Sequence, residues 1–190
     1  MLTDRFAQAV LYTTELHREQ TRKETQIPYI THLFAVCSLV LEDGGSEDEA
    51  ISALLHDGPE DQGGQPILDT IRADYGEEVA NTVAGLSDAL PAIGEEKAPW
   101  RERKEAYLWH LEEAPASVLK VSLADKLHNA RSILTDLGEI GEAVWDRFNA
   151  DRTDQAWYYG ALLRTFEARL PESRNLPEFR RVVGELFGPG

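Results

Sequence analysis

With 190 residues, 42% of them hydrophobic and 28% charged, the chain has room for one ordinary domain and enough apolar residues to build its core. This composition excludes a disordered chain, and no apolar run approaches the roughly 20 residues that a membrane-spanning helix needs. A formal net charge of −15 argues against binding to nucleic acid polymers or anionic membranes, because no basic field attracts their phosphates.

Cysteine usage and the N-terminus indicate the kind of protein. Cys37 is the only cysteine, which excludes an internal disulfide and a zinc site made of several thiolates. It lies in an apolar stretch and is predicted to be a small buried core residue. Residues 1–5 lack the basic segment followed by an apolar one that a secretory signal has, so we predict a cytoplasmic protein.

Apolar residues at helical spacing predict helices along the whole chain, and no alternating strand pattern competes with them. The expected ranges are residues 4–19, 28–43, 46–57, 65–75, 77–86, 101–111, 115–137, 143–148, 155–169 and 178–187. The sequence therefore predicts an all-α fold, formed by a single domain over residues 1–190.

Three local signals set helix ends. Ser46 and Glu49 have the spacing of a capping box, which predicts a helix start. Gly58-Pro59 predicts the end of that helix at His56-Asp57, because neither residue continues a helix easily. The Pro- and Gly-rich stretch at residues 87–99 predicts a mobile loop inside one domain rather than a linker.

Four side chains on these predicted helices are candidates for a metal site: His32, His56, Asp57 and Asp125. Ionisable groups among apolar neighbours are costly when unpaired, so several of them suggest a shared partner. Imidazole nitrogen and carboxylate oxygen together suit Mn²⁺, Fe²⁺ or Zn²⁺. The spacing alone is weak evidence, because a His-Asp dipeptide is common by chance.

The order of these residues, H…HD…D, resembles the signature of the HD superfamily of metal-dependent phosphohydrolases, in which the four residues bind the metal. Three longer stretches narrow the likeness, because they resemble the hydrolase domain of RelA/SpoT-type enzymes. They are Gln20-Thr21-Arg22-Lys23 followed by Pro28-Tyr29-Ile30-Thr31-His32, then Leu54 to Asp61, then Leu123 to Arg131.

The resemblance implies an HD-domain helical bundle that hydrolyses the 3′-pyrophosphate of guanosine tetra- or pentaphosphate. The products would be GDP or GTP and pyrophosphate, formed by metal-activated water, usually with Mn²⁺. The chain is too short to hold synthetase and regulatory domains as well, so it looks like a stand-alone small alarmone hydrolase whose partner is a small nucleotide.

The resemblance also assigns a catalytic role to Glu60 and Asp61, which match the second half of the family's HDxxED pattern. A carboxylate at either position can orient or deprotonate the attacking water. Without the adjoining motif, the same pair would be interpreted as a solvated loop.

Four further residues match the family's nucleotide contacts. Arg22 and Lys23 correspond to a basic pair beside the nucleotide, where cationic groups meet the base or phosphate oxygens. Asn129 corresponds to the residue that reads the purine edge, since an amide both donates and accepts hydrogen bonds. Ser132 lies where many alarmone hydrolases have a threonine that contacts the base.

The chain departs from the family pattern at three places. Leu33 follows His32 where the family often has proline, and Gly58-Pro59 replaces the usual small or β-branched pair before the catalytic carboxylates. Ser132 keeps the threonine hydroxyl but loses a methyl contact, so guanine selectivity is less secure than hydrolysis.

Two alternatives stay open, and the departures at Gly58-Pro59 and Ser132 favour the first of them. One is an HD-type phosphatase for another nucleotide, such as an adenosine alarmone, NADPH or a nucleoside monophosphate. The other is a non-catalytic module that binds the alarmone without turning it over. The sequence leaves the oligomeric state open.

Overall fold

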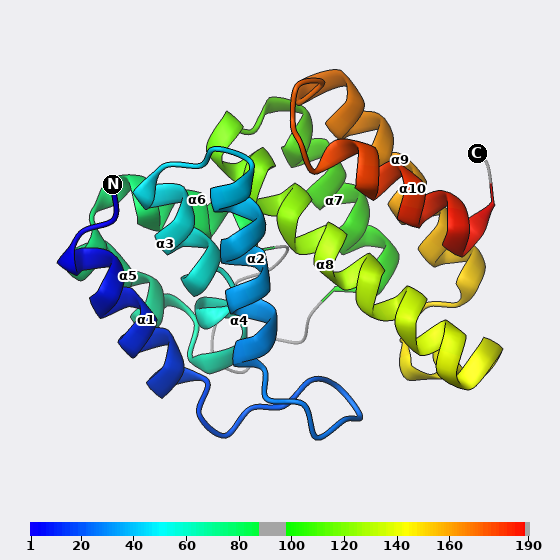
Figure 1. Ribbon diagram of the computed structural model, residues 1–190, viewed down its shortest axis with the longest axis horizontal. Coiled ribbons are helices and arrows are strands. Elements are labelled where there is room, and N and C mark those ends of the chain that lie inside the picture. Colours follow the sequence, from blue (N-terminus) through cyan, green and yellow to red (C-terminus); the bar gives the residue numbers. More distant parts are fainter. Residues whose placement is uncertain (88–97, 189–190) are drawn as a thin grey trace. The chain divides into compact units, whose positions relative to one another are not determined.

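The computed structural model describes residues 1–87 and 98–188, and these residues fall into two compact units, Met1–Lys97 and Ala98–Gly190 (Figure 1). Every regular element of the described residues is a helix, so the predicted all-α class is confirmed. Most of the loop predicted at residues 87–99 lies outside the described residues. The assignment of residues 1–190 to one domain stays a prediction, and each unit is described by itself.

The first unit is built around one buried helix. Its elements are α1 (Asp4–Leu16), α2 (Ile30–Glu42), α3 (Glu47–Leu55), α4 (Gly58–Gln62), α5 (Gln65–Tyr75) and α6 (Glu77–Leu86). Helix α3 is central because it packs against α1, α2, α5 and α6, and its residues 50–55 are all buried. The predicted capping box starts it: the Ser46 hydroxyl accepts from the Glu49 backbone, and the Glu49 carboxylate accepts from the Ser46 backbone.

A buried hydrogen bond from α1 fixes the other end of α3. The Thr13 hydroxyl, fully buried, donates to the backbone carbonyl of Leu54 over 2.7 Å. Carbonyls in the last turn of a helix have no partner inside the helix, so an unmatched one in the core is costly. The bond therefore holds the backbone immediately before His56 and Asp57.

We expect Thr13→Val to lower the free energy of unfolding by about 1–3 kcal/mol, because valine keeps the shape but leaves the Leu54 carbonyl without its donor. Urea unfolding followed by circular dichroism measures this. Thr14→Val is the matched control, because the exposed Thr14 hydroxyl donates only to Val10 one turn earlier on the same helix. Equal stability losses in the two variants would contradict the role given to Thr13.

The segment after α3 differs from the sequence-based expectation. Helix α3 ends as predicted, but Gly58-Pro59 begins the short helix α4 rather than a loop. Proline fits there because the first turn of a helix needs no backbone donor. A side chain at position 58 would meet Leu16 Cδ2 at 3.1 Å, so glycine lets α1 approach closely. The pair thus places Glu60 and Asp61 in a helical turn.

The second unit contains α7 (Trp100–Glu113), α8 (Ala116–Ile140), the 3-10 helix η1 (Gly141–Arg147), α9 (Arg152–Arg169) and α10 (Leu176–Phe187). Helix α8 packs against α9, α10 and η1, and α9 also packs against α7 and α10. The helix predicted at residues 143–148 corresponds to η1, so it is a 3-10 helix and not an α-helix. Gly141 ends α8 with a φ of +65°, a conformation that favours glycine.

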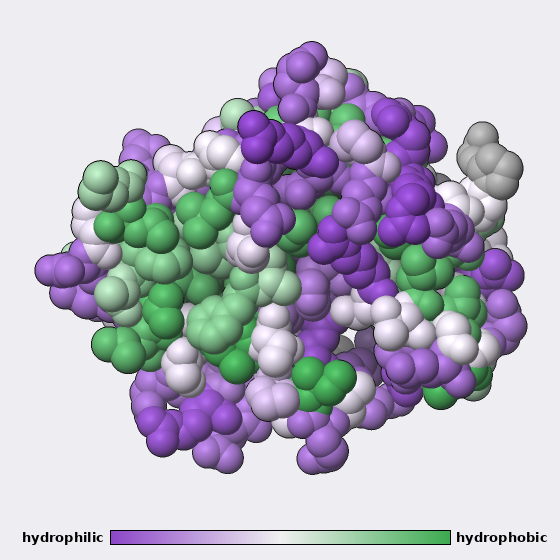
Figure 2. Space-filling view, viewed as in Figure 1, coloured by the Kyte–Doolittle hydropathy of each residue, from purple (hydrophilic) through white to green (hydrophobic). Residues whose placement is uncertain are grey.

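Core and surface agree with the composition. Cys37 is buried, as predicted, and burial raises the pKa of its thiol to about 11, which makes it a poor nucleophile. Figure 2 shows apolar and polar side chains side by side on one face, so the net charge of −15 does not make this face uniformly polar. Among the described residues, no helix is both long and apolar enough to cross a bilayer.

Candidate metal centre

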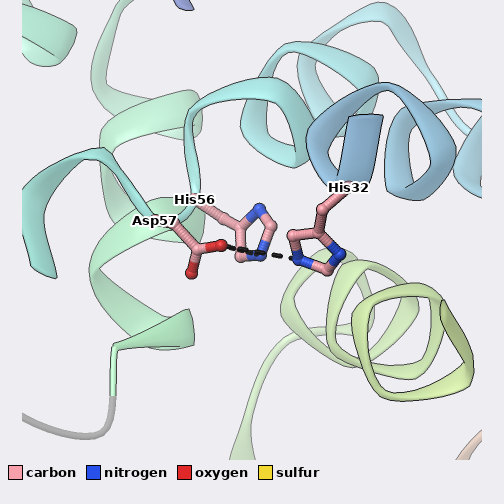
Figure 3. A group of neighbouring side chains, drawn as sticks. All are labelled: His32, His56 and Asp57. Atoms are coloured by element: carbon pink, nitrogen blue, oxygen red, sulfur yellow. Dashed lines mark ion pairs between the residues drawn. The ribbon is translucent and has the colours of Figure 1, made fainter. Parts of the chain in front are cut away.

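The structure brings three of the predicted metal ligands together in the first unit. His32 lies on α2, and His56 and Asp57 lie between α3 and α4 (Figure 3). Each offers one ligand atom, and these atoms lie within 4.8 Å of one another. Nε2 of His32 is 3.5 Å from Asp57 Oδ2, and Nε2 of His56 is 3.1 Å from the same oxygen.

The proton of His56 can be placed from its neighbours. Its Nδ1 lies 2.9 Å from the Ala53 carbonyl oxygen, which only accepts, so Nδ1 carries a proton. In the neutral ring, the Nε2 lone pair then faces Asp57. Hydrogen bonding of one imidazole nitrogen to a carbonyl in this way is typical of histidines that bind metal through the other.

Asp57 is held in its ionised form. Burial works to raise the pKa of its carboxyl, but attraction to the imidazoles of His56 and His32 in their protonated form, and hydrogen bonds from them, outweigh burial and hold that pKa well below its ordinary value. The result is a carboxylate oxygen facing two imidazole nitrogens in a largely buried position.

This donor set fits a divalent cation. When His56 is neutral, its Nε2 and the Asp57 oxygen both carry lone pairs that face each other. A cation between the two atoms removes this repulsion by accepting both lone pairs. Two ligands held at about 2.1 Å from one ion lie up to about 4.2 Å apart. The separations of 3.1 and 3.5 Å agree with that limit. Imidazole with carboxylate suits Mn²⁺, Fe²⁺ and Zn²⁺ alike.

Tyr29 completes the immediate surroundings of Asp57. Its hydroxyl donates to Asp57 Oδ2 over 2.6 Å, and its ring centroid lies 5.5 Å from that of His32. The guanidinium of Arg22 lies over the ring of Tyr29, with its central carbon 6.0 Å from the ring centroid. The predicted nucleotide contact Arg22 is thus close to the site, and Lys23 is the exposed residue after it.

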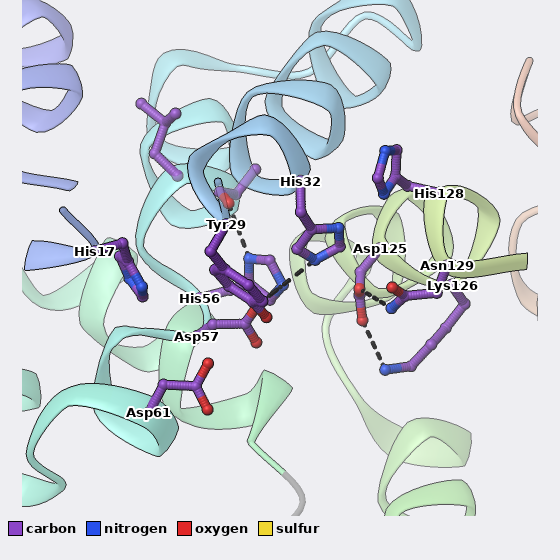
Figure 4. Close-up of polar contacts among 12 residues, drawn as sticks. His17, Tyr29, His32, His56, Asp57, Asp61, Asp125, Lys126, His128 and Asn129 are labelled. Atoms are coloured by element: carbon purple, nitrogen blue, oxygen red, sulfur yellow. Dashed lines mark hydrogen bonds and ion pairs between the residues drawn. The ribbon is translucent and has the colours of Figure 1, made fainter. Parts of the chain in front are cut away.

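The predicted catalytic pair lies on α4, directly after the ligands. The backbone nitrogen of Asp61 donates to the Asp57 carbonyl, so Asp61 lies one helical turn beyond Asp57 (Figure 4). Its Oδ2 accepts a hydrogen bond of 2.8 Å from the side-chain amide of Gln20. Glu60 is half-buried in the first turn of the same helix.

The remaining predicted site residues lie on α8 in the second unit. Asp125 is buried there, and its carboxylate accepts hydrogen bonds of 2.6 Å from both Lys126 and Asn129. Burial works to lower the pKa of Lys126, but the Asp125 carboxylate outweighs burial and raises that pKa well above its ordinary value. The Ser132 hydroxyl donates to the His128 carbonyl over 3.1 Å. The assignments of Asp125, Asn129 and Ser132 stay predictions.

Comparison with known families shows to which protein family the chain belongs. The HD domain family matches residues 9–155, which is most of the chain and includes all the predicted ligands. The chain belongs to the HD domain family. It is accordingly a metal-dependent phosphohydrolase, and His32, His56 and Asp57 are the group in the first unit that suits the divalent metal of this family.

Curated relatives narrow this HD-family hydrolase to the RelA/SpoT type. It is 32% identical to the guanosine-3′,5′-bis(diphosphate) 3′-pyrophosphohydrolase MESH1 of Xenopus tropicalis over 129 residues, covering 66% of this chain and 68% of the relative. It is 30% identical to the bifunctional (p)ppGpp synthase/hydrolase SpoT of Escherichia coli K12 over 135 residues. That match covers 68% of this chain but only 18% of the longer relative.

Solved structures of similar proteins agree with the fold of the HD-family hydrolase. A Listeria monocytogenes protein, lmo0812, is similar with a TM-score of 0.72 and 26% identity, covering 83% of this chain and 99% of that one. A metazoan orthologue of SpoT, described as hydrolysing ppGpp, has a TM-score of 0.77 and 21% identity, covering 100% of this chain and 99% of that one. At that identity, the second likeness concerns the fold alone.

Three residues near the HD-family site have no role in the sequence-based prediction: His17, Gln20 and Tyr29. Gln20 and Tyr29 lie inside the stretches that resemble RelA/SpoT-type enzymes, and that position is the signal that would have singled them out. His17 carries no such signal, because a histidine at the end of a helix is ordinary. Only the folded structure places its ring against Tyr29.

Proposed function

We propose that this chain hydrolyses guanosine tetra- and pentaphosphate, (p)ppGpp, at the 3′-pyrophosphate and releases GDP or GTP and pyrophosphate. The observation that carries the proposal is the His32, His56 and Asp57 group, followed one turn later by Asp61. The likeness of the chain to curated 3′-pyrophosphohydrolases supports this choice of substrate.

We further propose that the metal is Mn²⁺, held by the two histidines and Asp57 with Asp125 as a fourth ligand. When bound, a divalent cation lowers the pKa of water and offsets phosphate charge. Fe²⁺ and Zn²⁺ are the other metals that this donor set suits. The cytoplasmic location expected from the sequence stays a prediction.

The chain's own residues then divide the work of hydrolysis. The carboxylate of Asp61 or Glu60 accepts a proton from the attacking water, whose oxygen bonds to the phosphorus next to the ribose O3′. The bond from that phosphorus to O3′ breaks, the proton reaches O3′, and pyrophosphate leaves. Arg22 and Lys23 supply local positive charge, which an anionic substrate needs on a protein with net charge −15. Asn129 and Ser132 are proposed to contact the base.

The test is turnover of ppGpp by the purified chain with Mn²⁺, followed by chromatography of GDP and measurement of pyrophosphate. We expect both products in equal amounts, no turnover with a chelator, and recovery on adding Mn²⁺. Intact ppGpp under every metal tested would remove the proposal.

Asp125 is tested separately by Asp125→Asn. We expect Mn²⁺ binding, measured by calorimetry, to weaken by at least about tenfold, because the amide lacks the carboxylate charge. Asp136→Asn is the matched control, since Asp136 also lies on α8 and pairs with Arg147 over 2.7 Å. Equal Mn²⁺ affinity in both variants and the unchanged chain would show that Asp125 is not a ligand.

A second candidate is an HD-type phosphatase for another nucleotide. The specific observation that favours it is Ser132, whose hydroxyl donates to its own helix and which replaces the family's base-contacting threonine. Turnover of adenosine alarmones, NADPH and nucleoside monophosphates, measured beside ppGpp, decides between the candidates. A larger kcat/KM for one of them than for ppGpp would favour the second.

A further inference from the structure

His17 is a buried polar residue next to the metal centre with no assigned role. It directly follows α1, is 2% exposed, and lies with its Nδ1 2.6 Å from Oε1 of Gln20. A side-chain amide oxygen only accepts, so His17 Nδ1 donates. The other ring nitrogen, Nε2, is buried without a hydrogen-bond partner among residues 1–87 and 98–188. Within the described residues, the hydrogen bond at Nδ1 is therefore the polar contact that the ring makes.

The amide of Gln20 is fixed in one orientation by three neighbours. Its Oε1 accepts from His17 Nδ1 and from Gln62 Nε2 at 2.5 Å, while its Nε2 donates to Asp61 Oδ2 at 2.8 Å. The opposite orientation would turn an NH₂ group toward two donors and a carbonyl oxygen toward a carboxylate. The Asp61 carboxylate only accepts, so the NH₂ group of Gln20 must face it, and a proton on His17 Nδ1 stabilises this orientation by donating to Oε1.

The ring plane of His17 is itself held by Tyr29. The two rings, both labelled in Figure 4, stack with centroids 5.5 Å apart and an angle of 24° between their planes. The backbone supports the same contact, because the Tyr29 nitrogen donates to the Gln20 carbonyl over 2.9 Å. Tyr29 thus touches Asp57 through its hydroxyl and His17 through its ring face.

Asp61 needs such support because of where it lies. It is exposed and belongs to a helix of five residues, so little packing limits its side-chain rotation. A carboxylate that must accept a proton from one particular water loses rate when it is free to turn away. The hydrogen bond from Gln20 to Oδ2 restricts this rotation.

We propose that His17 and Gln20 are positioning residues that hold the Asp61 carboxylate for proton transfer. This inference rests on the proposed function, in which Asp61 is a catalytic carboxylate. Groups that hydrogen-bond catalytic or metal-binding side chains typically change activity by about 10–100-fold when they are removed.

The first experiment replaces the amide. We expect Gln20→Met to lower kcat for ppGpp by about 10–100-fold, with unchanged KM and unchanged Mn²⁺ affinity, because the lost amide bonds Asp61, His17 and Gln62 and none of the proposed metal ligands. Gln65→Met is the matched control, since Gln65 makes the same bond, amide to carboxylate at 2.8 Å, with Asp69, and both residues are exposed on α5. Circular dichroism and thermal unfolding confirm that both variants are folded.

The second experiment separates the donor of His17 from its ring. His17→Asn keeps an N–H near the Nδ1 position but loses the ring, whereas His17→Phe keeps a ring against Tyr29 but has no donor. The proposal predicts a higher kcat for His17→Asn than for His17→Phe. A purely structural role predicts the reverse order, because phenylalanine retains the packing.

The third experiment needs no turnover. The sequence has five histidines, so ¹⁵N–¹H spectra of the metal-free chain can assign each ring. We expect the neutral His17 ring to carry its proton on Nδ1. A proton on Nε2 would overturn the proposal, even if Gln20→Met does not fold.

The outcomes separate this inference from the proposed function. If the unchanged chain hydrolyses ppGpp and Asp61→Asn does not, while Gln20→Met and His17→Phe retain full kcat, the inference is wrong and the proposed function stands. If the unchanged chain does not hydrolyse ppGpp, the proposed function fails, and the Nδ1 proton still tests the hydrogen-bonded arrangement itself.

Discussion

Replacing His56 by alanine should lower kcat/KM for ppGpp by about a thousandfold or more, the largest effect expected of any single substitution in this chain. The imidazole supplies one proposed ligand, and its Nε2 also lies 3.1 Å from the Asp57 oxygen that supplies another. The substitution therefore removes one proposed metal ligand and leaves a second, Asp57, with less support. Steady-state hydrolysis and calorimetric titration with Mn²⁺ measure the two losses.

His110→Ala is the matched control for His56→Ala. His110 is exposed on α7, where alanine favours the helix, so activity and Mn²⁺ affinity should stay at the level of the unchanged chain. Retained Mn²⁺ affinity in His56→Ala would contradict the assignment of His56 as a ligand. Retained affinity together with lost turnover would instead indicate that His56 contacts the substrate.

Local sequence signals predicted those parts of the fold that depend on neighbouring residues. The capping box at Ser46 predicted the start of α3, because both of its hydrogen bonds join residues three apart. Gly58-Pro59 predicted the end of α3 but not the start of α4, since proline both ends one helix and suits the first turn of the next. Residues 141–147 form a 3-10 helix, a distinction that apolar spacing over so short a stretch does not make.

In the candidate site too, the sequence pattern grouped some of the residues but did not reveal contacts between distant parts of the chain. His56 and Asp57 are adjacent in sequence, the family pattern grouped His32 with them, and the structure brings the three side chains together. The bond from Gln20 to Asp61 joins residues 41 apart, and no periodicity marks such a pair. The stack of His17 on Tyr29 depends on how the segment after α1 returns to α2. Contacts of this kind arise from tertiary packing, so sequence spacing does not reveal them.

Replacing Asp61 by asparagine should lower kcat by about 10²–10⁴-fold, the range typical of a lost general base. Asparagine has nearly the same shape, and its side-chain oxygen still accepts from the Gln20 amide, but it cannot take a proton from water. Because Asp61 is not one of the three clustered ligands, Mn²⁺ affinity and KM should change little. Hydrolysis of ppGpp at saturating substrate measures kcat directly.

Asp69→Asn is the control that separates chemistry from the loss of one surface charge. Asp69 is exposed and accepts from Gln65 over 2.8 Å, the same bond length as that between Gln20 and Asp61. Its replacement should leave kcat unchanged. If Asp61→Asn also keeps its kcat, Asp61 is not the base, and Glu60→Gln becomes the deciding variant because Glu60 is the other carboxylate of the α4 pair. A loss in Glu60→Gln alone would move the proton acceptor by one residue while leaving the metal ligands as proposed.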